Sequence, residues 1–237
     1  MKILLSGSSG LVGLELLKAL RCNNYKVICL VRNKNQIKKD TIFWDPENNV
    51  LKLEDLKGID AVIHLAGENI ANKRWSKKQK KAILDSRVNS TKLLADKIAN
   101  LDLKPKTFIS ASAIGYYGTQ TNESLNESYP PGDSFLSFVC KNWENATKSA
   151  KESGIKTVNI RIGVVLSPKG GALKKMLPPF KLGLGGKLGD GTQIMSWISL
   201  ADTIQSIIHI LNNEQLSGPV NLTNPNPVSN YNFTKML

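Results

Sequence analysis

Three glycines near the start of the chain have the spacing of a phosphate-binding turn. Residues 2–13 read KILLSGSSGLVG, an apolar strand-like run that leads into Gly7, Gly10 and Gly13, and a helix-like stretch follows at once. The first glycine of such a turn permits the tight bend, the second lets backbone approach a pyrophosphate, and the third allows close helix–strand packing. The helix N-terminus adds free N–H groups, so Gly7, Gly10, Leu11, Val12 and Gly13 predict a dinucleotide site, although glycine also serves ordinary turns and caps.

The end of the second predicted strand indicates which dinucleotide is bound. In NAD-preferring sites an acidic residue there accepts hydrogen bonds from the ribose hydroxyls. This strand ends in Val31 followed by Arg32. A guanidinium matches a 2′-phosphate in charge and geometry, so the pair favours NADP(H) over NAD(H), unless Arg32 is an ordinary exposed arginine.

The next apolar strand runs into His64-Leu65-Ala66-Gly67. Small residues at this point let backbone approach the ribose and pyrophosphate, so Leu65, Ala66 and Gly67 are further candidate cofactor contacts. His64 lies within the apolar run, so we expect it to pack there rather than to act as a catalyst.

Strand-like and helix-like segments alternate along most of the chain. Strands are predicted over 26–31, 61–65, 107–112 and 157–166, and helices over 77–99 and 135–153. Such alternation with nearly continuous apolar strands is typical of a doubly wound parallel sheet of the Rossmann type, covered by helices on both faces. We therefore predict an α/β fold with a cofactor-binding domain over residues 1–166.

Residues 167–237 are predicted to form a small annex on the substrate side. Prolines and glycines interrupt residues 168–191, which predicts that this segment holds no long regular element. Ser199 is a plausible cap for a helix over 200–211, and 218–222 reads as a last strand; we expect 199–222 to pack back on the first domain. The last residues, 231–237, begin another helix-like pattern.

Composition narrows the function classes. The net charge is +13, from 32 Lys and Arg against 19 Asp and Glu. The excess is scattered lysine, with one denser patch over 73–81, so surface charge or attraction of an anionic ligand explains it better than nucleic-acid binding. No apolar run approaches the roughly 20 residues of a membrane span. Cys22, Cys29 and Cys140 have no metal-like spacing; reduced thiols and a cytoplasmic protein are the simplest expectation.

The motifs together resemble an extended short-chain dehydrogenase/reductase, and more closely its atypical, YfcH-like "epimerase family". The resemblance covers essentially the whole chain and rests on the glycine run, residues 64–70 (HLAGENI), 73–75 (KRW), 86–87 (SR), 110–118 (SASAIGYYG), 161–166 (RIGVVL), 176–186 (MLPPFKLGLGG), Trp197-Ile198 and Asp202. It implies a Rossmann domain binding NADP(H), with Arg87 and Val165 as additional cofactor contacts. Family members continue beyond the position of Leu237, so the annex looks shortened. Dimers are common in the superfamily, so a homodimer is an expectation, although the oligomeric state stays open.

The resemblance also raises the question of catalysis. Competent members of the superfamily use a Tyr-x-x-x-Lys pair for acid–base work and a serine to orient the substrate. Here Ser112 suits the serine role, but Leu136 and Cys140 stand where the tyrosine and lysine are expected. The best remaining phenols are Tyr116 and Tyr117, which could face the nicotinamide or could equally well be an aromatic pair packed under their loop. Cys140 as a nucleophile is a weaker alternative.

These sequence features lead to three hypotheses about function. The first is an NADP(H)-dependent oxidoreductase or nucleotide-sugar epimerase/dehydratase with an atypical site made of Ser112, Tyr116 and Tyr117 and a small, anionic substrate. The second is a non-catalytic NADP(H)-binding sensor or interaction module. The third is a nucleic-acid or cell-division partner that works through the basic surface.

Overall fold

The computed structural model describes residues 1–118 and 124–237, and its centre is a parallel sheet of seven strands. The strands lie in the order β10-β6-β5-β4-β1-β2-β3, and every neighbouring pair is parallel. Their bounds are β1 (Lys2–Ser6), β2 (Lys26–Val31), β3 (Thr41–Phe43), β4 (Ala61–His64), β5 (Thr107–Ala113), β6 (Lys156–Ile162) and β10 (Gly218–Leu222). This is the doubly wound α/β fold that the alternation of segments predicted.

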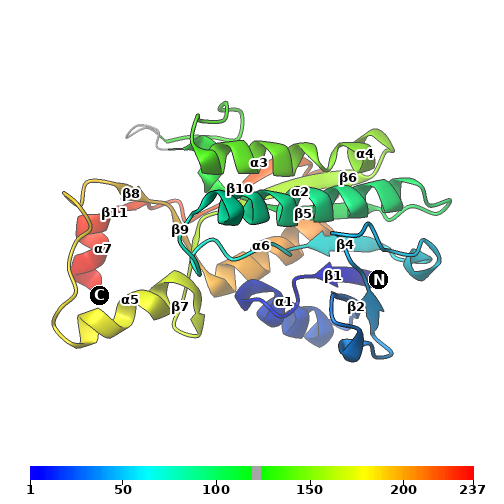
Figure 1. Ribbon diagram of the computed structural model, residues 1–237, viewed down its shortest axis with the longest axis horizontal. Helices are drawn as coiled ribbons and strands as arrows, with labels where there is room; N and C mark the ends of the chain where they lie inside the picture. Colours follow the sequence, from blue (N-terminus) through cyan, green and yellow to red (C-terminus); the bar gives the residue numbers. More distant parts are fainter. Residues whose placement is uncertain (119–123) are drawn as a thin grey trace.

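Helices cover both faces of the sheet (Figure 1). Helices α1 (Leu11–Cys22) and α6 (Leu200–Asn212) contact each other on one face; α2 (Lys77–Ala99), α3 (Phe135–Asn145) and α4 (Lys148–Glu152) lie together on the other. Side chains of a strand alternate between faces, so Ile3 and Leu5 join the buried cluster under α1 and α6, while Leu4 joins the cluster under α2 and α4. Burial on both faces explains why the strand sequences are apolar without alternation.

The remaining elements are short 3-10 turns and a lobe at the carboxyl ends of the strands. The 3-10 turns are η1 (Lys34–Gln36), η2 (Glu54–Leu56) and η3 (Ile114–Tyr117). Strands β7 (Val164–Ser167) and β9 (Trp197–Ser199) pair in parallel, and β8 (Ile194–Met195) pairs antiparallel with β11 (Val228–Ser229). With α5 (Gly171–Lys181) and α7 (Asn230–Met236), they form the lobe at the left of Figure 1.

Helix α5 corrects one prediction. The segment over 168–191 was predicted to hold no long regular element, yet α5 spans eleven residues with Pro178 and Pro179 inside it. Each proline leaves one carbonyl of the preceding turn without its helical N–H partner. The carbonyls concerned belong to Lys174 and Lys175; these residues and both prolines are exposed, so water can bind there. Two turns of good helix formers before the prolines then suffice to start the helix.

Two segments predicted to be continuous are broken in the structure. The strand expected over 157–166 divides at Gly163, where a Cβ would lie 2.8 Å from the Ser196 carbonyl oxygen; β6 stays in the main sheet and β7 leaves it for β9. The helix expected over 135–153 divides into α3 and α4. In contrast, the bounds predicted for α2 are those observed.

The order of the strands reverses between β1 and β4. From β1 the chain moves outward to β2 and β3, whereas β4, β5 and β6 extend the sheet on the other side. Open α/β sheets bind ligands in the crevice at such a switch point, outside the carboxyl ends of the strands. Here this crevice lies between the glycine turn after β1 and the segment that follows His64.

Residues 199–222 join the main body. Strand β10 pairs in parallel with β6 along its whole length, and α6 contributes Ile204, Ile207 and Ile210 to the buried cluster against α1. Ser199 caps α6 by accepting a hydrogen bond from the Asp202 amide at 2.9 Å. The chain therefore crosses from the lobe back to the sheet before it ends on β11 and α7.

Candidate functional site

The glycine turn brings β1, the crevice and α1 together. Gly7 has φ +74°, a conformation that suits glycine, and a Cβ there would lie 2.7 Å from the carbonyl carbon of Leu65. A Cβ on Gly13 would lie 2.1 Å from the carbonyl oxygen of Gly7. The first glycine thus allows the turn to touch the segment after β4, and the third allows α1 to touch the turn.

Free amides face the crevice at the start of α1. Gly10 is the N-cap residue with extended backbone and no side-chain cap, and the first helical hydrogen bond is donated by the Leu14 amide to the Gly10 carbonyl at 2.8 Å. The amides of Leu11, Val12 and Gly13 precede that bond, so they are the unpaired donors that a helix N-terminus offers to an anion. The side chain of Leu11 lies beneath the turn at Gly170 and Gly171, which places the start of α5 beside the site.

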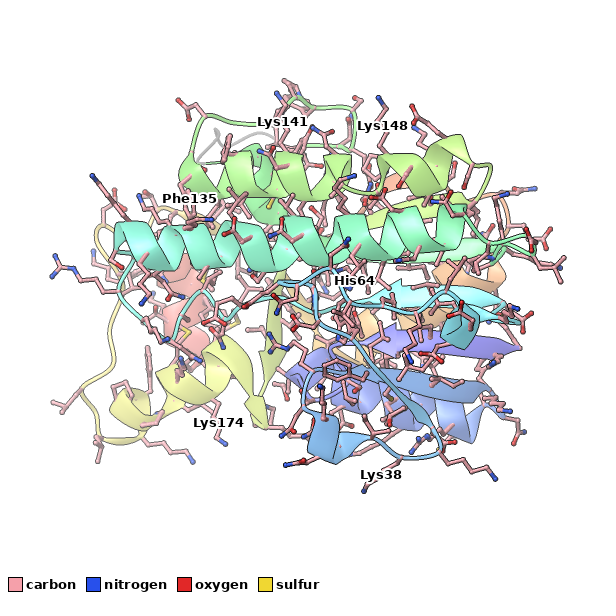
Figure 2. The ribbon with its side chains drawn as sticks, turned by 45° about the vertical axis from the view of Figure 1, so that its right-hand side comes forward. Lys38, His64, Phe135, Lys141, Lys148 and Lys174 are labelled. Atoms are coloured by element: carbon pink, nitrogen blue, oxygen red, sulfur yellow. The ribbon has the colours of Figure 1, made fainter. Side chains whose placement is uncertain are left out.

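His64 fixes the two strands that flank the crevice. Figure 2 shows it at the end of β4 behind α2, and it is fully buried. Its Nδ1 lies 2.6 Å from Ser6 Oγ and its Nε2 lies 3.1 Å from Ser90 Oγ. Ser90 Oγ donates to the Ser86 carbonyl, so it accepts from Nε2–H, and Nδ1 is left to accept from Ser6 Oγ. Burial lowers the pKa of His64 to about 3. The ring is therefore a neutral link between β1, β4 and α2, and it is packed within the strand as the sequence predicted.

A pocket of about 480 Å³ lies between the end of β2, the segment after β4, and α2. Arg32 and residues 44–47, at the start of a hairpin closed by the Asp45–Val50 bridge, form one wall. Ala66 and Gly67 adjoin the crevice, and one stripe of α2 forms the opposite wall. Val31, half-buried, ends the strand just before Arg32. The structure thus places Arg32, Ala66 and Gly67 around one cavity next to the glycine turn.

Arg87 lies beneath Gly67 and carries an unneutralised charge. Its Nη1 donates to the carbonyls of Glu68 at 2.9 Å and Ile83 at 3.1 Å, and its guanidinium stacks on Trp143 with 5.0 Å to the ring centroid. No ion pair joins it to a carboxylate within the described ranges, and burial lowers the pKa of its guanidinium. A half-buried cation with free N–H groups beside the crevice is suited to hold an anionic or hydroxylated ligand.

Ser112 belongs to a buried network that sequence inspection missed. Its hydroxyl donates to Glu144 Oε1 at 2.7 Å, and Glu144 forms a two-point ion pair with Arg161, with N–O distances of 2.9 Å. Arg161 is almost fully buried on β6. Its position within the apolar run of residues 158–162 was the available signal, because a buried arginine requires a partner.

The same network distinguishes the two tyrosines. Tyr117 is buried; its hydroxyl accepts from Arg161 Nη1 at 2.9 Å and donates to Asn221 Oδ1 at 2.7 Å. Tyr116 is half-buried and its ring stacks on the Arg161 guanidinium, with 3.5 Å between Cζ and the ring centroid. Within the described ranges the Tyr116 hydroxyl has no hydrogen-bond partner. Tyr117 is thus committed to the fold, and Tyr116 has the free phenol.

The helix that should carry a Tyr–Lys pair carries neither group. Leu136 and Cys140 lie one turn apart on the side of α3 that contacts η3, because a Cβ on Gly115 would lie 3.3 Å from Leu136 Cβ and 3.8 Å from Cys140 Sγ. Lys141 is exposed on the outer side of α3 (Figure 2). Burial raises the pKa of the Cys140 thiol to about 11, which argues against the nucleophile alternative.

The remaining candidates lie around the same edge. Val165 is half-buried on β7, in register with Ile198 of β9, next to the start of α5. Across the crevice, Lys175 of α5 donates to the Ala71 carbonyl at 3.3 Å, which connects the lobe to the segment after β4.

Within the described ranges, none of the helices has the length and apolar character that a bilayer crossing requires.

Comparison with known proteins agrees with this geometry. Residues 3–223 match the model of the NAD-dependent epimerase/dehydratase family. The chain belongs to this family. It is 43% identical over 232 residues to an epimerase family protein of Mycobacterium bovis, a match that covers 98% of this chain and 76% of that protein.

Two solved structures of epimerase-type proteins superpose closely. The nucleoside-diphosphate sugar epimerase from Corynebacterium glutamicum has a TM-score of 0.89 at 40% identity, covering 100% of this chain and 49% of the other, so this chain spans about half of that protein. The human epimerase family protein SDR39U1, solved with NADPH, has a TM-score of 0.87 at 32% identity, covering 98% of this chain and 77% of the other. The extended short-chain dehydrogenase/reductase resemblance is thereby confirmed.

Proposed function

We propose that this chain binds NADP(H) across the crevice at the carboxyl ends of β1 and β4. The observation that carries the proposal is the contact of Gly7 with Leu65 beside three unpaired amides at the start of α1. This arrangement leaves room for a pyrophosphate on the N–H groups of Leu11, Val12 and Gly13. Arg87, with its unneutralised charge, then contacts a ribose or phosphate oxygen, and Leu65 to Gly67 and Val165 line the path of the cofactor.

Preference for NADP(H) over NAD(H) follows from the end of β2. Val31 stands where an NAD-preferring site has its carboxylate, and Arg32 reaches the pocket beside it. The human family member solved with NADPH supports the same preference. Titration of NADPH and NADH by calorimetry tests it: Arg32→Ala should lower NADPH affinity and leave NADH affinity unchanged. An unchanged preference for NADPH in this variant would refute the role of Arg32.

The proposed reaction class is oxidoreduction, or epimerisation or dehydration of a nucleotide sugar. When bound, the nicotinamide supplies the hydride acceptor or donor, so the protein has to orient a substrate and manage one proton. Ser112 and Tyr116 are the residues proposed for these tasks. Ser112 donates a hydrogen bond to Glu144 and also contacts the Cys140 thiol, so we propose that it orients the substrate from a buried position. Within the described ranges the Tyr116 hydroxyl has no hydrogen-bond partner, and the Tyr117 ring packs edge-on against the Tyr116 ring.

The substrate is proposed to be a small anionic molecule. Lys174, Lys175, Lys181 and Lys187 stand on the lobe that faces the crevice, and Figure 2 shows Lys174 on α5. We further propose a cytoplasmic protein, because Cys22, Cys29 and Cys140 are all free thiols. A homodimer remains our expectation for the assembly.

The residues at the acid–base positions of α3 favour a second candidate function. Leu136 and Cys140 at the acid–base positions are what a cofactor-binding protein without catalysis would carry, namely a redox sensor or an interaction module. Turnover with a panel of nucleotide sugars and carbonyl compounds, followed at the nicotinamide absorption band, separates the two. Cofactor binding without any turnover would favour the sensor.

A further inference from the structure

The pocket beside Arg32 has a second basic wall. Lys78, Lys81 and Asp85 all line it from α2, together with Ser86 and Asn89. Lys78, Lys81, Asp85 and Asn89 are spaced three or four residues apart and Ser86 adjoins Asp85, so they form one stripe on the helix. The stripe faces Arg32 and the hairpin that follows β3, with Ala66 and Gly67 between the two walls. A ligand that reaches Arg32 from the crevice therefore enters between Arg32 and this stripe.

Three of the seven charged side chains that line the pocket are already paired with or hydrogen-bonded to neighbours. Asp45 accepts hydrogen bonds from the amides of Glu47 and Asn48 and from Asn48 Nδ2 at 2.7 Å, and these bonds lower its pKa. Asp85 is paired with Lys81. These groups stabilise the hairpin and the helix, and they leave little capacity for a ligand.

The charges without a partner are two cations and two carboxylates. Arg32 and Lys78 have no hydrogen bond or ion pair to another residue within the described ranges, and the same holds for the carboxylates of Glu47 and Glu68. Arg32 nevertheless acts electrostatically on the Asp45 carboxylate, and Glu68 acts on the Arg87 guanidinium, so neighbours partly offset both of these charges. In the part of the chain that the structure describes, Lys78 is the cation of the lining that has no such neighbour, and it stands on α2 across the pocket from Arg32. A phosphate between the two walls would therefore meet a second cation there.

We propose that Lys78 is a second determinant of NADP(H) specificity, holding the 2′-phosphate from the α2 side of the pocket while Arg32 holds it from the β2 side. This proposal rests on the proposed function, because it assumes that the adenosine half of the cofactor occupies this pocket. Lys81 has a supporting role: its pairing keeps the Asp85 carboxylate from acting on the phosphate.

Lys77 provides a matched control for the experiment. It is the neighbouring lysine in the first turn of α2, equally exposed, but it does not line the pocket. Calorimetric titration of NADPH and NADH is carried out on the full chain and on Lys78→Ala, Lys78→Glu and Lys77→Ala. We expect Lys78→Ala to weaken NADPH binding about threefold to tenfold and Lys78→Glu to weaken it further, because a charge-assisted contact to phosphate is lost or reversed. NADH affinity should stay unchanged in both, and Lys77→Ala should match the wild type.

The outcomes separate this inference from the function on which it rests. If the wild type prefers NADPH and Lys78→Ala binds it as Lys77→Ala does, the role of Lys78 is overturned and the cofactor proposal stands. If the wild type binds NADH as tightly as NADPH, both the preference and the role of Lys78 are overturned. If the folded wild type binds neither nucleotide, the proposed function itself fails.

Discussion

Gly10 and Gly13 lie three residues apart, and the structure predicts opposite consequences for replacing them with alanine. A Cβ on Gly13 would lie 2.1 Å from the Gly7 carbonyl oxygen, whereas real Cβ contacts essentially never fall below 3.0 Å. Gly7 cannot retreat, because its other side meets the backbone of Leu65 and Ala66. Helix α1 must therefore move away from the turn by about 1 Å, since 3.0 minus 2.1 leaves 0.9 Å.

The magnitude of the Gly13→Ala effect follows from two opposing contributions. Alanine inside a helix is favoured over glycine by about 1 kcal/mol. Overpacking against fixed backbone costs about 3 kcal/mol, the upper part of the usual range. We expect a net loss of about 2 kcal/mol in the free energy of unfolding, which lowers Tm by roughly 4–8 °C for a chain of this size.

Gly10→Ala should behave in the opposite way. The nearest atom to a Cβ on Gly10 is the Gly7 carbonyl oxygen at 3.4 Å, and its φ of −76° suits any residue. The loss of stability should stay below about 1 kcal/mol, because alanine is only a poorer N-cap than glycine. If the pyrophosphate lies on the amides of α1 as proposed, the added methyl group crowds it, and losing one charge-assisted hydrogen bond weakens NADPH binding about tenfold or more.

Urea unfolding and calorimetric titration of both variants provide the assay. We expect Gly13→Ala to lose stability and Gly10→Ala to lose cofactor affinity while it unfolds almost as the wild type does. A Gly13→Ala protein as stable as the wild type would refute the packing argument. A Gly10→Ala protein that binds NADPH normally would refute the placement of the pyrophosphate.

Four further predictions concern His64, Glu144 and the two tyrosines. Burial lowers the pKa of His64 to about 3, so between pH 6.5 and 3 the unfolded chain takes up a proton that the folded chain does not. The free energy of unfolding should therefore fall by up to about 2 kcal/mol from pH 6.5 to 5. In urea unfolding, His64→Asn should show a shallower dependence on pH than the wild type. Glu144→Gln leaves the buried Arg161 charge without its ion-pair partner and should cost about 3–5 kcal/mol, so a loss below 1 kcal/mol in urea unfolding would contradict the network. Tyr117→Phe should cost about 1 kcal/mol of stability. Tyr116→Phe should leave stability unchanged and lower turnover at least about 100-fold, and full activity in this variant would remove Tyr116 from the proposed chemistry.

Local patterns were sufficient for much of the fold. The glycine turn, the strand before it and the helix after it are contiguous, and their roles follow from the conformational freedom of glycine. Helix α2 was predicted with its observed bounds because its apolar residues recur at helical spacing, and in the structure Ser76 caps it. His64 was predicted to be a packed residue because it lies within an apolar strand. Helix α5 was missed because its two prolines are strong local signals against a helix. The helix tolerates them because they are exposed to solvent, and that exposure depends on the tertiary structure.

By itself, the sequence determined the fold class, the family and the position of the glycine turn, because these depend on neighbouring residues and on the period of apolar positions. Only the tertiary structure decided what the candidate side chains do. Glu144 meets Arg161 and Ser112 from three separate elements, and Tyr117 reaches Asn221 across 104 residues of chain. Two adjacent tyrosines that are equivalent in sequence thus become one buried support and one free phenol, since hydrogen-bond partners depend on which strands lie side by side.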